Sequence, residues 1–384
     1  MLKDNRHIAH YDMDQFFVSI ERLRNSKLKD KPILIGGSND RGIVAACSNE
    51  AIQFGIHPGM QMRIAQRLCK HANIVRADYE EYSKQSKLIF EVIKDSVPLV
   101  EKSNLDEFYV DLTGMDKFFG CMKFTNELKT KLYKHSGLAA SSGLASNKMV
   151  SKVAALQIKP YGQLEIPFGN EKSFLAPLSV LKIPGVGKET GFKLIRMGVG
   201  TIKTLSEIPP EMLSDVVGKA GYELSRRANG IDESPVIPYV EQKSIATEFT
   251  FQQDTISLDV LNGELVRMTE ALAFKLRKQK KVTGCVVVKL RYSDDEPHSI
   301  QKSIAYCNTD HGLIAVAKEL FKKLYTRRVL VRMVGIRFTN LIPGTYQIDL
   351  FSDSEETVKL YQSIDSIKKR FGEGFLKRAS AGKL

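Results

Sequence analysis

The sequence of 384 residues lacks the features of several broad classes of protein. Its five cysteines, at positions 47, 69, 121, 285 and 307, include no C-x-x-C pair, which argues against a zinc site and a disulfide framework. No uninterrupted apolar run approaches the length that crosses a bilayer. The chain also enters a strand-like segment, IAHYDMD, with no charged and apolar leader before it. These absences predict a reduced, cytoplasmic protein without membrane contact.

The composition is that of a folded protein with a strong positive charge. Hydrophobic residues make up 43% and charged residues 26% of the chain, and its length favours about two to four domains. The formal net charge is +13. Such an excess favours a polyanionic partner, with nucleic acid ahead of an anionic membrane surface. A basic protein with no such partner is the alternative that charge alone leaves open.

Strands and helices alternate over residues 7–159, which predicts an α/β or α+β region. The helix expected at 83–97 carries Leu88, Val92 and Val97 on or near one face, and we expect that face to be buried. The other expected elements are strands at 7–14, 31–37, 42–48 and 139–145, and helices at 16–25, 62–70, 121–135 and 147–159.

Strand patterns vanish between residue 171 and about residue 229. The centre of this part, LKIPGVGKETGFKLIRMG, predicts two helices joined by a P-G-V-G turn, and the proline-bearing ESPVIPYV that follows it predicts a linker. The next segments predict a strand–helix–strand–strand–helix–strand order, typical of a small ferredoxin-like module. They span 244–251, 257–280, 284–292, 299–306, 312–327 and 329–340, and a last helix is expected from about Ser354 to Phe371.

Acidic residues stand at two places where buried strands are expected. Asp106 and Glu107 begin a strand after Ser103 and Asn104, which favour a turn, and Asp12 and Asp14 alternate on the first strand. A carboxylate that enters a sheet must be paired, hydrogen-bonded or bound to a metal. Acids from two adjacent strands suit Mg²⁺, which prefers oxygen ligands and shares them with phosphates. Ion pairs with lysine or arginine are the alternative.

Taken together and in order, these segments resemble the Y family of DNA polymerases, the lesion-bypass enzymes, and in particular its bacterial DNA polymerase IV branch. The matching motifs are YDMDQFFVSIE, SNLDEFYVDLTG and SNKMVSKVAALQIKPYG, and the resemblance runs from about His7 to Phe351. It implies an α+β multidomain fold with the right-hand polymerase arrangement. The implied domains are a palm with a mixed sheet and helices (1–23 and 80–170), small fingers (24–79), a helical helix–hairpin–helix thumb (171–232), a linker (233–243), a ferredoxin-like βαββαβ little finger (244–345), and a clamp-binding motif with a tail (346–384).

The resemblance also implies roles for residues of the active site. Asp12, Asp106 and Glu107 would bind two Mg²⁺ ions, for which Mn²⁺ can substitute, with help from the backbone carbonyl of Met13. Phe17 would be the steric gate, a ring that clashes with a ribose 2′-hydroxyl, and packing in the core is its alternative. Two further residues would serve nucleotide binding: Lys159, which would reach the triphosphate, and Phe16, as a core residue or a phosphate-side contact.

One segment departs from the family pattern. Family members often carry Y-E-A-R in the fingers, where tyrosine and arginine grip the triphosphate, whereas this chain has NEAI. Asn49 can donate one hydrogen bond to a bound nucleotide, but Ile52 cannot bind phosphate. We therefore expect weaker nucleotide binding than the family norm, or compensation by another basic residue such as Arg41 or Arg63.

Contacts with primer–template DNA are expected in the thumb and the little finger. In GCVVVKLRYS, Val286, Val288 and Leu290 alternate with Val287, Lys289 and Arg291, so that one strand face is apolar and the other largely basic. That basic face either contacts a phosphate backbone or is solvated. The expected contacts in the thumb are Gly185 and Gly187 of the P-G-V-G turn and Lys188 directly after it. In the little finger they are Lys275, Arg277 and Lys278 of the helix expected at 257–280, and Lys289 and Arg291 of the strand that follows.

A short motif after the last module predicts a protein partner. The segment QIDLF resembles the motif by which bacterial polymerases dock on the sliding clamp. Its anchors would be Gln347, Leu350 and Phe351. An ordinary strand end whose leucine and phenylalanine pack inward is the alternative.

The function implied is template-directed, low-fidelity translesion DNA synthesis from dNTPs by a monomer, without 3′–5′ proofreading. A catalytically weak paralogue that serves as a DNA- and clamp-binding accessory factor is the second hypothesis. The NEAI departure supports it, while the complete set of Asp12, Asp106 and Glu107 argues against it. A helix–hairpin–helix nuclease or glycosylase would not account for the last module.

Overall fold

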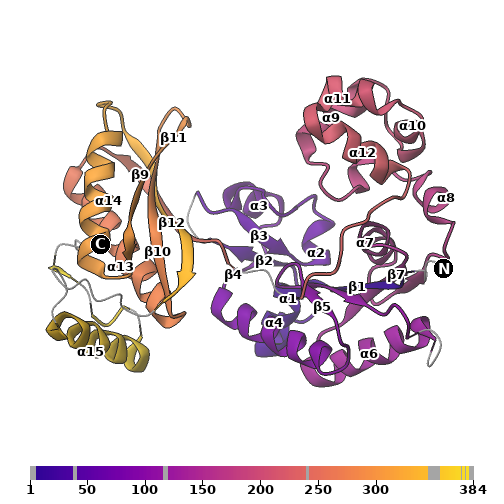
Figure 1. Cartoon of the computed structure of the whole chain (residues 1–384), viewed down its shortest axis with the longest axis horizontal. Coiled ribbons are helices and arrows are strands. Elements are labelled where there is room, and N and C mark those ends of the chain that lie inside the picture. The colour runs from indigo at the N-terminus through magenta and orange to yellow at the C-terminus, as the bar shows by residue number, and fades with distance from the viewer. Residues whose placement is uncertain are drawn as a thin grey trace. The chain divides into compact units, whose positions relative to one another are not determined.

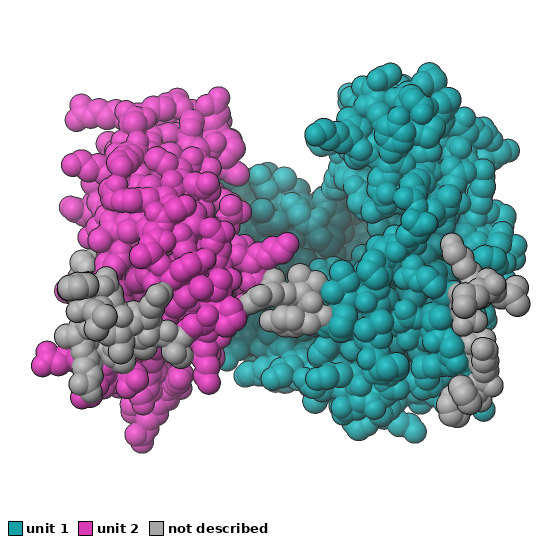
Figure 2. Space-filling view, viewed as in Figure 1, with its two compact units in different colours: residues 1–240 teal, residues 241–384 magenta. Residues whose placement is uncertain are grey.

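The chain forms two compact units, residues 1–240 and 241–384 (Figure 2). The division falls within the segment predicted to be a linker. The computed structural model describes residues 6–37, 41–115, 120–238, 242–344, 355–372, 374–376 and 378–379. Within these ranges, no helix is long and apolar enough to cross a membrane.

The first unit is organised by a five-stranded sheet in the order β5-β6-β1-β7-β8 (Figure 1). Along β1 (Ile8–Met13), Ala9, Tyr11 and Met13 enter the core formed with α4 (Tyr79–Lys94) and α6 (Cys121–Ser136). Residues 8, 10 and 12 alternate onto the opposite face, which is covered by α7 (Lys148–Gln157). The other strands are β5 (Val100–Lys102), β6 (Glu107–Asp111), β7 (Ala140–Ala145) and β8 (Gln163–Glu165).

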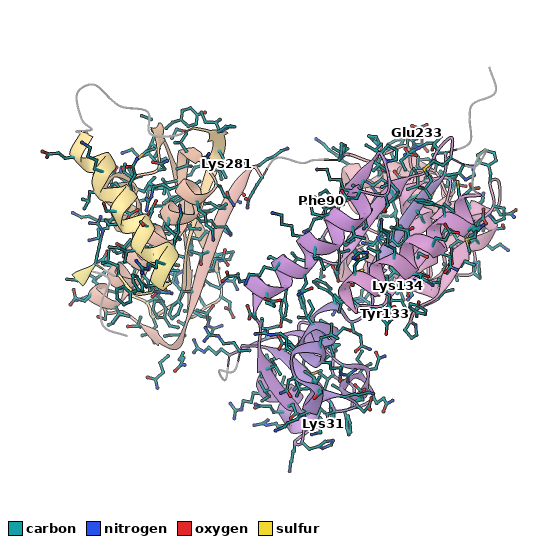
Figure 3. The ribbon with its side chains drawn as sticks, turned by 90° about the horizontal axis from the view of Figure 1, so that it is seen from below. Lys31, Phe90, Tyr133, Lys134, Glu233 and Lys281 are labelled. Atoms are coloured by element: carbon teal, nitrogen blue, oxygen red, sulfur yellow. The ribbon has the colours of Figure 1, made fainter. Side chains whose placement is uncertain are left out.

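The two helices on the first face differ from the sequence prediction in one detail. In α4 the fully buried apolar positions are Ile89 and Ile93, and Leu88 is 44% exposed, so the predicted stripe was wrong at Leu88. A shift of one residue turns a side chain by about 100° around the helix axis, which moves it off the buried face. The outer side of α6 carries Tyr133 and Lys134, both exposed (Figure 3).

A smaller sheet is inserted between α1 (Phe16–Arg24) and α4. It has the order β3-β2-β4, with β2 (Ile33–Gly36) antiparallel to β3 (Val44–Cys47) and parallel to β4 (Asn73–Arg76), a strand not predicted. Its other elements are the 3-10 turn η1 (Ser26–Leu28) and the helices α2 (Asn49–Ile52) and α3 (Met62–Leu68). Gly36 is required where β2 meets β3, because a Cβ there would lie 2.2 Å from the Ile43 carbonyl oxygen.

The rest of the first unit is helical, as the loss of strand patterns predicted. The described residues 171–238 contain no strand beyond one isolated bridge, Ser179 to Thr201. Leu194, Ile202, Leu205 and Leu213 form the centre of its core. The elements are α8 (Glu171–Leu175), η2 (Val180–Lys182), α9 (Lys188–Arg196), α10 (Ile202–Ser206), α11 (Pro210–Val217), η3 (Gly218–Ala220) and α12 (Gly221–Ala228).

The second unit has the predicted βαββαβ order. An antiparallel sheet, β11-β10-β12-β9, carries two helices on one face (Figure 1). Val286, Val288 and Leu290 enter the core beneath these helices, so Lys289 and Arg291 lie on the other face, as predicted. The elements are β9 (Ser244–Thr255), α13 (Leu258–Lys278), β10 (Lys281–Tyr292), β11 (Pro297–Cys307), α14 (Asp310–Leu324) and β12 (Val331–Pro343).

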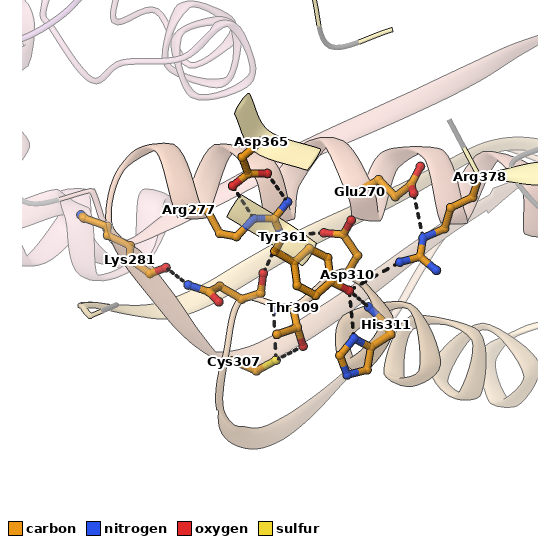
Figure 4. A network of polar contacts seen from close by, with 11 residues as sticks. Glu270, Arg277, Lys281, Cys307, Thr309, Asp310, His311, Tyr361, Asp365 and Arg378 are labelled. Atoms are coloured by element: carbon orange, nitrogen blue, oxygen red, sulfur yellow. Dashed lines mark hydrogen bonds and ion pairs between the residues drawn. The ribbon is translucent and has the colours of Figure 1, made fainter. Parts of the chain in front are cut away.

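The last helix, α15 (Glu355–Phe371), packs against the helical layer through a buried polar network (Figure 4). The Arg277 guanidinium is 4% exposed and donates to both Asp365 carboxylate oxygens at 2.8 Å and to Asp310 at 2.6 Å. Tyr361, 2% exposed, accepts a hydrogen bond at its hydroxyl from the His311 backbone N–H at 3.1 Å. Arg277 therefore joins three helices within its unit, and the expectation that it contacts DNA is not retained.

We expect Asp365→Ala to destabilise the second unit by about 3–5 kcal/mol, because it removes one partner of a buried charge. Urea titration of the full chain, followed by a probe in the second unit, measures the loss. The matched control is Glu356→Ala, which removes an exposed acid from the same helix. Equal unfolding midpoints for the two variants would show that the network does not hold α15 in place.

Candidate active site

The hairpin between β5 and β6 places two acids at a strand start. The backbone N–H groups of Ser103 and Asn104 donate to the Glu107 carbonyl oxygen at 3.0 and 3.3 Å, which confirms the predicted turn. The Ser86 hydroxyl of α4 donates to the Leu105 carbonyl oxygen and fixes the turn to the helix. The chain therefore enters β6 with the carboxylates of Asp106 and Glu107 at the sheet edge.

The register of the sheet brings a third acid to this place. β1 runs antiparallel to β6 with Asp12 opposite Glu107, and the Met13 N–H donates to the Asp106 carbonyl oxygen at 2.9 Å. Opposed residues of antiparallel strands have Cβ atoms about 4.5–5.5 Å apart. The three predicted carboxylates therefore lie together, and the Asp12 side chain is only 5% exposed.

Lysines of α7 and of the turn after it form ion pairs with two of these carboxylates. Lys159 Nζ is 2.6 Å from Asp12 Oδ1, and Lys152 Nζ is 2.9 and 2.7 Å from the two Glu107 oxygens. One turn earlier, Lys148 Nζ pairs with Glu101 at 2.7 Å. Sequence reasoning found Lys159 but missed Lys152. The available signal was its spacing of four residues from Lys148, which places both on one helix face.

Burial and mutual repulsion make the carboxylate cluster electrostatically costly. Burial raises the pKa of Asp12 to about 6, opposed by Lys159 and reinforced by the charges of Glu107 and Asp106. Burial, and then the Glu107 charge, also raise the pKa of Asp106. A cation among these groups would offset both effects.

The donor chemistry of the cluster fits a divalent cation. Three carboxylates that repel one another at one sheet edge offer the hard oxygen ligands that Mg²⁺ takes. Among the described residues, no three His, Cys, Asp or Glu side chains converge closely enough to form a finished metal site. The ammonium groups of Lys152 and Lys159 neutralise Glu107 and Asp12 in this state. A bound ion would therefore take over oxygens that the lysines now contact.

The two phenylalanines after β1 have different surroundings. Phe16 is 3% exposed and packs in the core, which is one of its two expected positions. Phe17 is half-buried, and its ring stacks on Tyr82 at a centroid distance of 4.4 Å and meets Tyr79 edge-on at 5.9 Å. The Tyr82 hydroxyl donates to Glu21 at 2.8 Å. These contacts fix the Phe17 ring in α1, four residues after the last residue of β1.

The departure from the family motif lies in a short helix of the smaller sheet. Ser48 caps α2 by accepting from the Ala51 N–H at 3.4 Å. Asn49 is exposed, and so is Ile52, with 49% of its surface accessible. Arg63 of α3, suggested as a replacement cation, is also exposed. The apolar Ile52 side chain thus reaches solvent at the position where family members often carry an arginine.

The predicted DNA contacts fall in both units, and those of the second unit do not share one face of it. Gly185 has φ +90°, and Gly187 precedes α9 at its N-cap, so the turn leaves the first N–H groups of α9, beginning at Lys188, without a side-chain cap. In the second unit Lys275 and Lys278 are exposed on α13, whereas Lys289 and Arg291 lie on the opposite, helix-free face of the sheet. Lys289 also forms an ion pair with Glu248 at 2.7 Å. The predicted clamp anchors Gln347, Leu350 and Phe351 lie outside the described residues.

Two family models match the chain. Residues 11–156 match the impB/mucB/samB family, and residues 242–350 match the C-terminal domain of that family. A DNA polymerase IV of Dehalococcoides mccartyi is 33% identical over 371 residues, 96% of this chain and 95% of that protein. A DNA polymerase IV of Streptococcus pneumoniae serotype 4 is 34% identical over 341 residues, 87% of this chain and 97% of that protein.

A solved structure shares the fold. It is a Y-family DNA polymerase chimera with a TM-score of 0.78 and 23% sequence identity, and the match covers 88% of this chain and 99% of the other. The likeness confirms the predicted α+β polymerase fold. The relatives match almost the whole chain at about one third identity, and the carboxylates of the two predicted motifs meet at one sheet edge. The chain therefore belongs to the Y family of DNA-directed DNA polymerases, in the branch of the bacterial DNA polymerase IV enzymes.

Proposed function

We propose that the protein carries out low-fidelity translesion DNA synthesis on a primed template by two-metal-ion nucleotidyl transfer, without 3′–5′ proofreading. The single observation that carries the proposal is the register of β1 and β6, which sets Asp12 opposite Glu107 and beside Asp106. A cluster of buried and half-buried acids lowers the stability of a fold unless it serves a ligand. Magnesium-bound phosphates of a nucleotide are the ligand that this donor set suits.

In the reaction, the primer 3′-oxygen forms a phosphodiester bond to the α-phosphorus of a dNTP, the bond to the pyrophosphate leaving group breaks, and the 3′-hydroxyl proton passes to water. When bound, two Mg²⁺ ions would favour the ionised 3′-hydroxyl and offset charge on the phosphates. Asp12, Asp106 and Glu107 would hold them, with the Met13 carbonyl assisting. Lys159, now 2.6 Å from Asp12, would turn to the triphosphate and stabilise the departing pyrophosphate.

The shape of the site would also set sugar selectivity. We assign the steric gate to Phe17, because its ring is held flat against Tyr82 rather than free to rotate. A fixed ring can exclude a 2′-hydroxyl, whereas a mobile side chain would give way. Deoxynucleotides would therefore be selected by shape.

DNA would be held mainly through its backbone. The uncapped N-terminus of α9 and its Lys188 would meet phosphates, and Lys289 and Arg291 present positive charge on the helix-free sheet face. Lys275 and Lys278 lie on α13, on the helical side of the sheet. They would contact a segment of DNA other than the one that Lys289 and Arg291 contact. We also propose that the protein acts as a monomer and docks on a sliding clamp through residues 347–351.

The translesion part of the proposal is tested by primer extension past a template abasic site. We expect full-length product from the wild-type chain at a template position that stops a replicative polymerase. Undamaged template of the same sequence is the control for activity. A complete stop opposite the lesion, with normal extension of the control, would limit the function to ordinary synthesis.

Because of the NEAI segment, a catalytically weak accessory role is the second candidate function. One variant tests whether this segment weakens nucleotide binding. Ile52→Arg would restore a charge-assisted bond to phosphate, worth about 1.5–3 kcal/mol, so the dNTP KM should fall by about tenfold or more. Steady-state primer extension measures it. Leu88→Arg adds the same charge at an exposed position of α4 and should leave the KM unchanged. An unchanged KM in Ile52→Arg would mean that another group already grips the triphosphate.

A further inference from the structure

Asp14 is buried next to the active site and is not one of the three predicted metal ligands. It lies one residue beyond the end of β1 and is 8% exposed. The Ser141 hydroxyl of β7 donates to both Asp14 oxygens, at 2.9 and 3.1 Å. The Tyr161 backbone N–H donates to Asp14 Oδ2 at 2.8 Å. These bonds connect the Asp14 carboxylate to β7 and to the turn that follows α7.

That turn, residues 158–162, links α7 to β8 and carries Lys159. Tyr161 has φ +54°, a left-handed conformation that a tyrosine adopts only where its surroundings hold it. Ser142 N–H donates to the Gly162 carbonyl oxygen at 3.1 Å, which fixes the far end of the turn to β7. The position of Lys159 thus depends on how the peptide groups of Tyr161 are held.

A second buried charge holds the other side of Tyr161. Lys129 of α6 is 5% exposed, and its ammonium donates to the Tyr161 carbonyl oxygen at 3.0 Å. The same ammonium lies 4.3 Å from the centre of the Tyr161 ring. The ring also meets Tyr133 of α6 edge-on, at 6.2 Å between centroids. The N–H of Tyr161 is therefore held by an anion and its carbonyl by a cation, each from a different element of the unit.

We propose that Asp14 and Lys129 form a clamp on Tyr161 that positions Lys159 for the incoming nucleotide. Lys159 stands two residues before Tyr161, and its ammonium lies 2.6 Å from Asp12 and 4.0 Å from Asp14. Without the clamp, the turn would relax from its left-handed conformation and the ammonium would leave the acidic cluster. Asp14 and Lys129 are positioning residues in this scheme, since neither touches the nucleotide. The inference rests on the proposed role of Lys159 in the reaction.

The clamp itself is tested without any reaction, by hydrogen exchange of the full chain free of DNA, nucleotide and metal. In Asp14→Ala we expect peptides that cover residues 158–164 to exchange at least about tenfold faster than in the wild type, because the Tyr161 N–H loses its acceptor. Asp14→Asn keeps an acceptor oxygen and should recover most of the protection. Lys129→Met should raise exchange in the same peptides, and it replaces Asp14→Ala if that variant does not fold. Unchanged exchange in this segment would overturn the clamp.

The action through Lys159 is tested by kinetics on primer–template DNA with Mg²⁺. We expect Asp14→Ala and Lys129→Met each to raise the dNTP KM by about tenfold, which corresponds to the loss of one charge-assisted interaction with the triphosphate. In a Lys159→Met background, either change should add less than about twofold, because the residue through which it acts is already gone. Ser151→Ala, which removes a buried hydroxyl bonded within α7, should leave the KM unchanged.

The outcomes separate the clamp from the proposed reaction. Faster exchange together with a KM effect that disappears in the Lys159→Met background supports the inference. An unchanged KM, or a full additional effect in that background, overturns it even if the enzyme polymerises normally. If the wild-type chain adds no nucleotide, the proposed function fails, and the exchange experiment alone decides whether the clamp exists.

Discussion

Asp106→Ala should lower the rate of nucleotide addition on the order of 10³-fold, or about 4 kcal/mol of transition-state stabilisation. The carboxylate lies at the start of β6 beside the pair of Asp12 and Glu107, and burial raises its pKa. Its removal takes one anionic ligand from the metal site while leaving the hairpin bonds of Ser103 and Asn104 in place. Single-turnover primer extension at saturating dNTP and Mg²⁺ measures the loss.

The matched control for this variant lies on the same strand. Asp111 ends β6, and its carboxylate accepts from the Thr113 N–H at 3.0 Å, away from the cluster. Asp111→Asn should keep most of the activity. DNA binding by both variants should equal that of the wild type. A rate for Asp106→Ala close to that of Asp111→Asn would remove Asp106 from the catalytic set.

Phe17→Ala should lower the discrimination against ribonucleotides by about 100-fold or more, which corresponds to close to 3 kcal/mol. The ring stacks on Tyr82 and contacts Tyr79, so it forms a rigid wall that a smaller side chain cannot replace. Its loss would leave room for a 2′-hydroxyl. The ratio of kcat/KM for dCTP and CTP on one template measures the change.

Two further variants show whether the effect comes from the wall itself. Phe17→Leu keeps much of the volume and should fall between the wild type and Phe17→Ala. Phe54→Ala removes an exposed ring that meets His71 edge-on outside the strands of the smaller sheet, and the ratio should stay unchanged. If sugar discrimination in Phe17→Ala equals that of the wild type, Phe17 has only a packing role.

Much of the fold and the carboxylate set could be predicted, because both depend on local patterns. Short segments of sequence are enough to indicate the alternation along β1 and β10 and the Ser103–Asn104 turn. They also indicate the order of elements in the second unit. β4 was missed because its four residues have little pattern of their own. It forms by parallel pairing with β2, which a local pattern does not show.

The surroundings of the basic residues were harder to predict, for a different physical reason. A run of lysines and arginines looks alike in sequence whether its members are exposed or buried. The Arg277 side chain can be buried because Asp310 and Asp365, on two other helices, neutralise its charge. Lys152 reaches Glu107 because α7 packs across the face of the five-stranded sheet that carries Asp12. Both contacts are set by packing between distant segments. The spacing of Lys148 and Lys152 indicates that they share a helix face, but not which carboxylates that face meets.

We expect template-directed DNA synthesis by this chain to depend on the acids of β1 and β6. The most direct measurement is extension of a 5′-labelled primer on an undamaged template by purified wild-type protein with dNTPs. We expect Mg²⁺-dependent addition of the nucleotides complementary to the template, and no addition when the metal is removed by a chelator. No primer extension at saturating dNTP, DNA and Mg²⁺, from folded protein that binds the DNA, would contradict it.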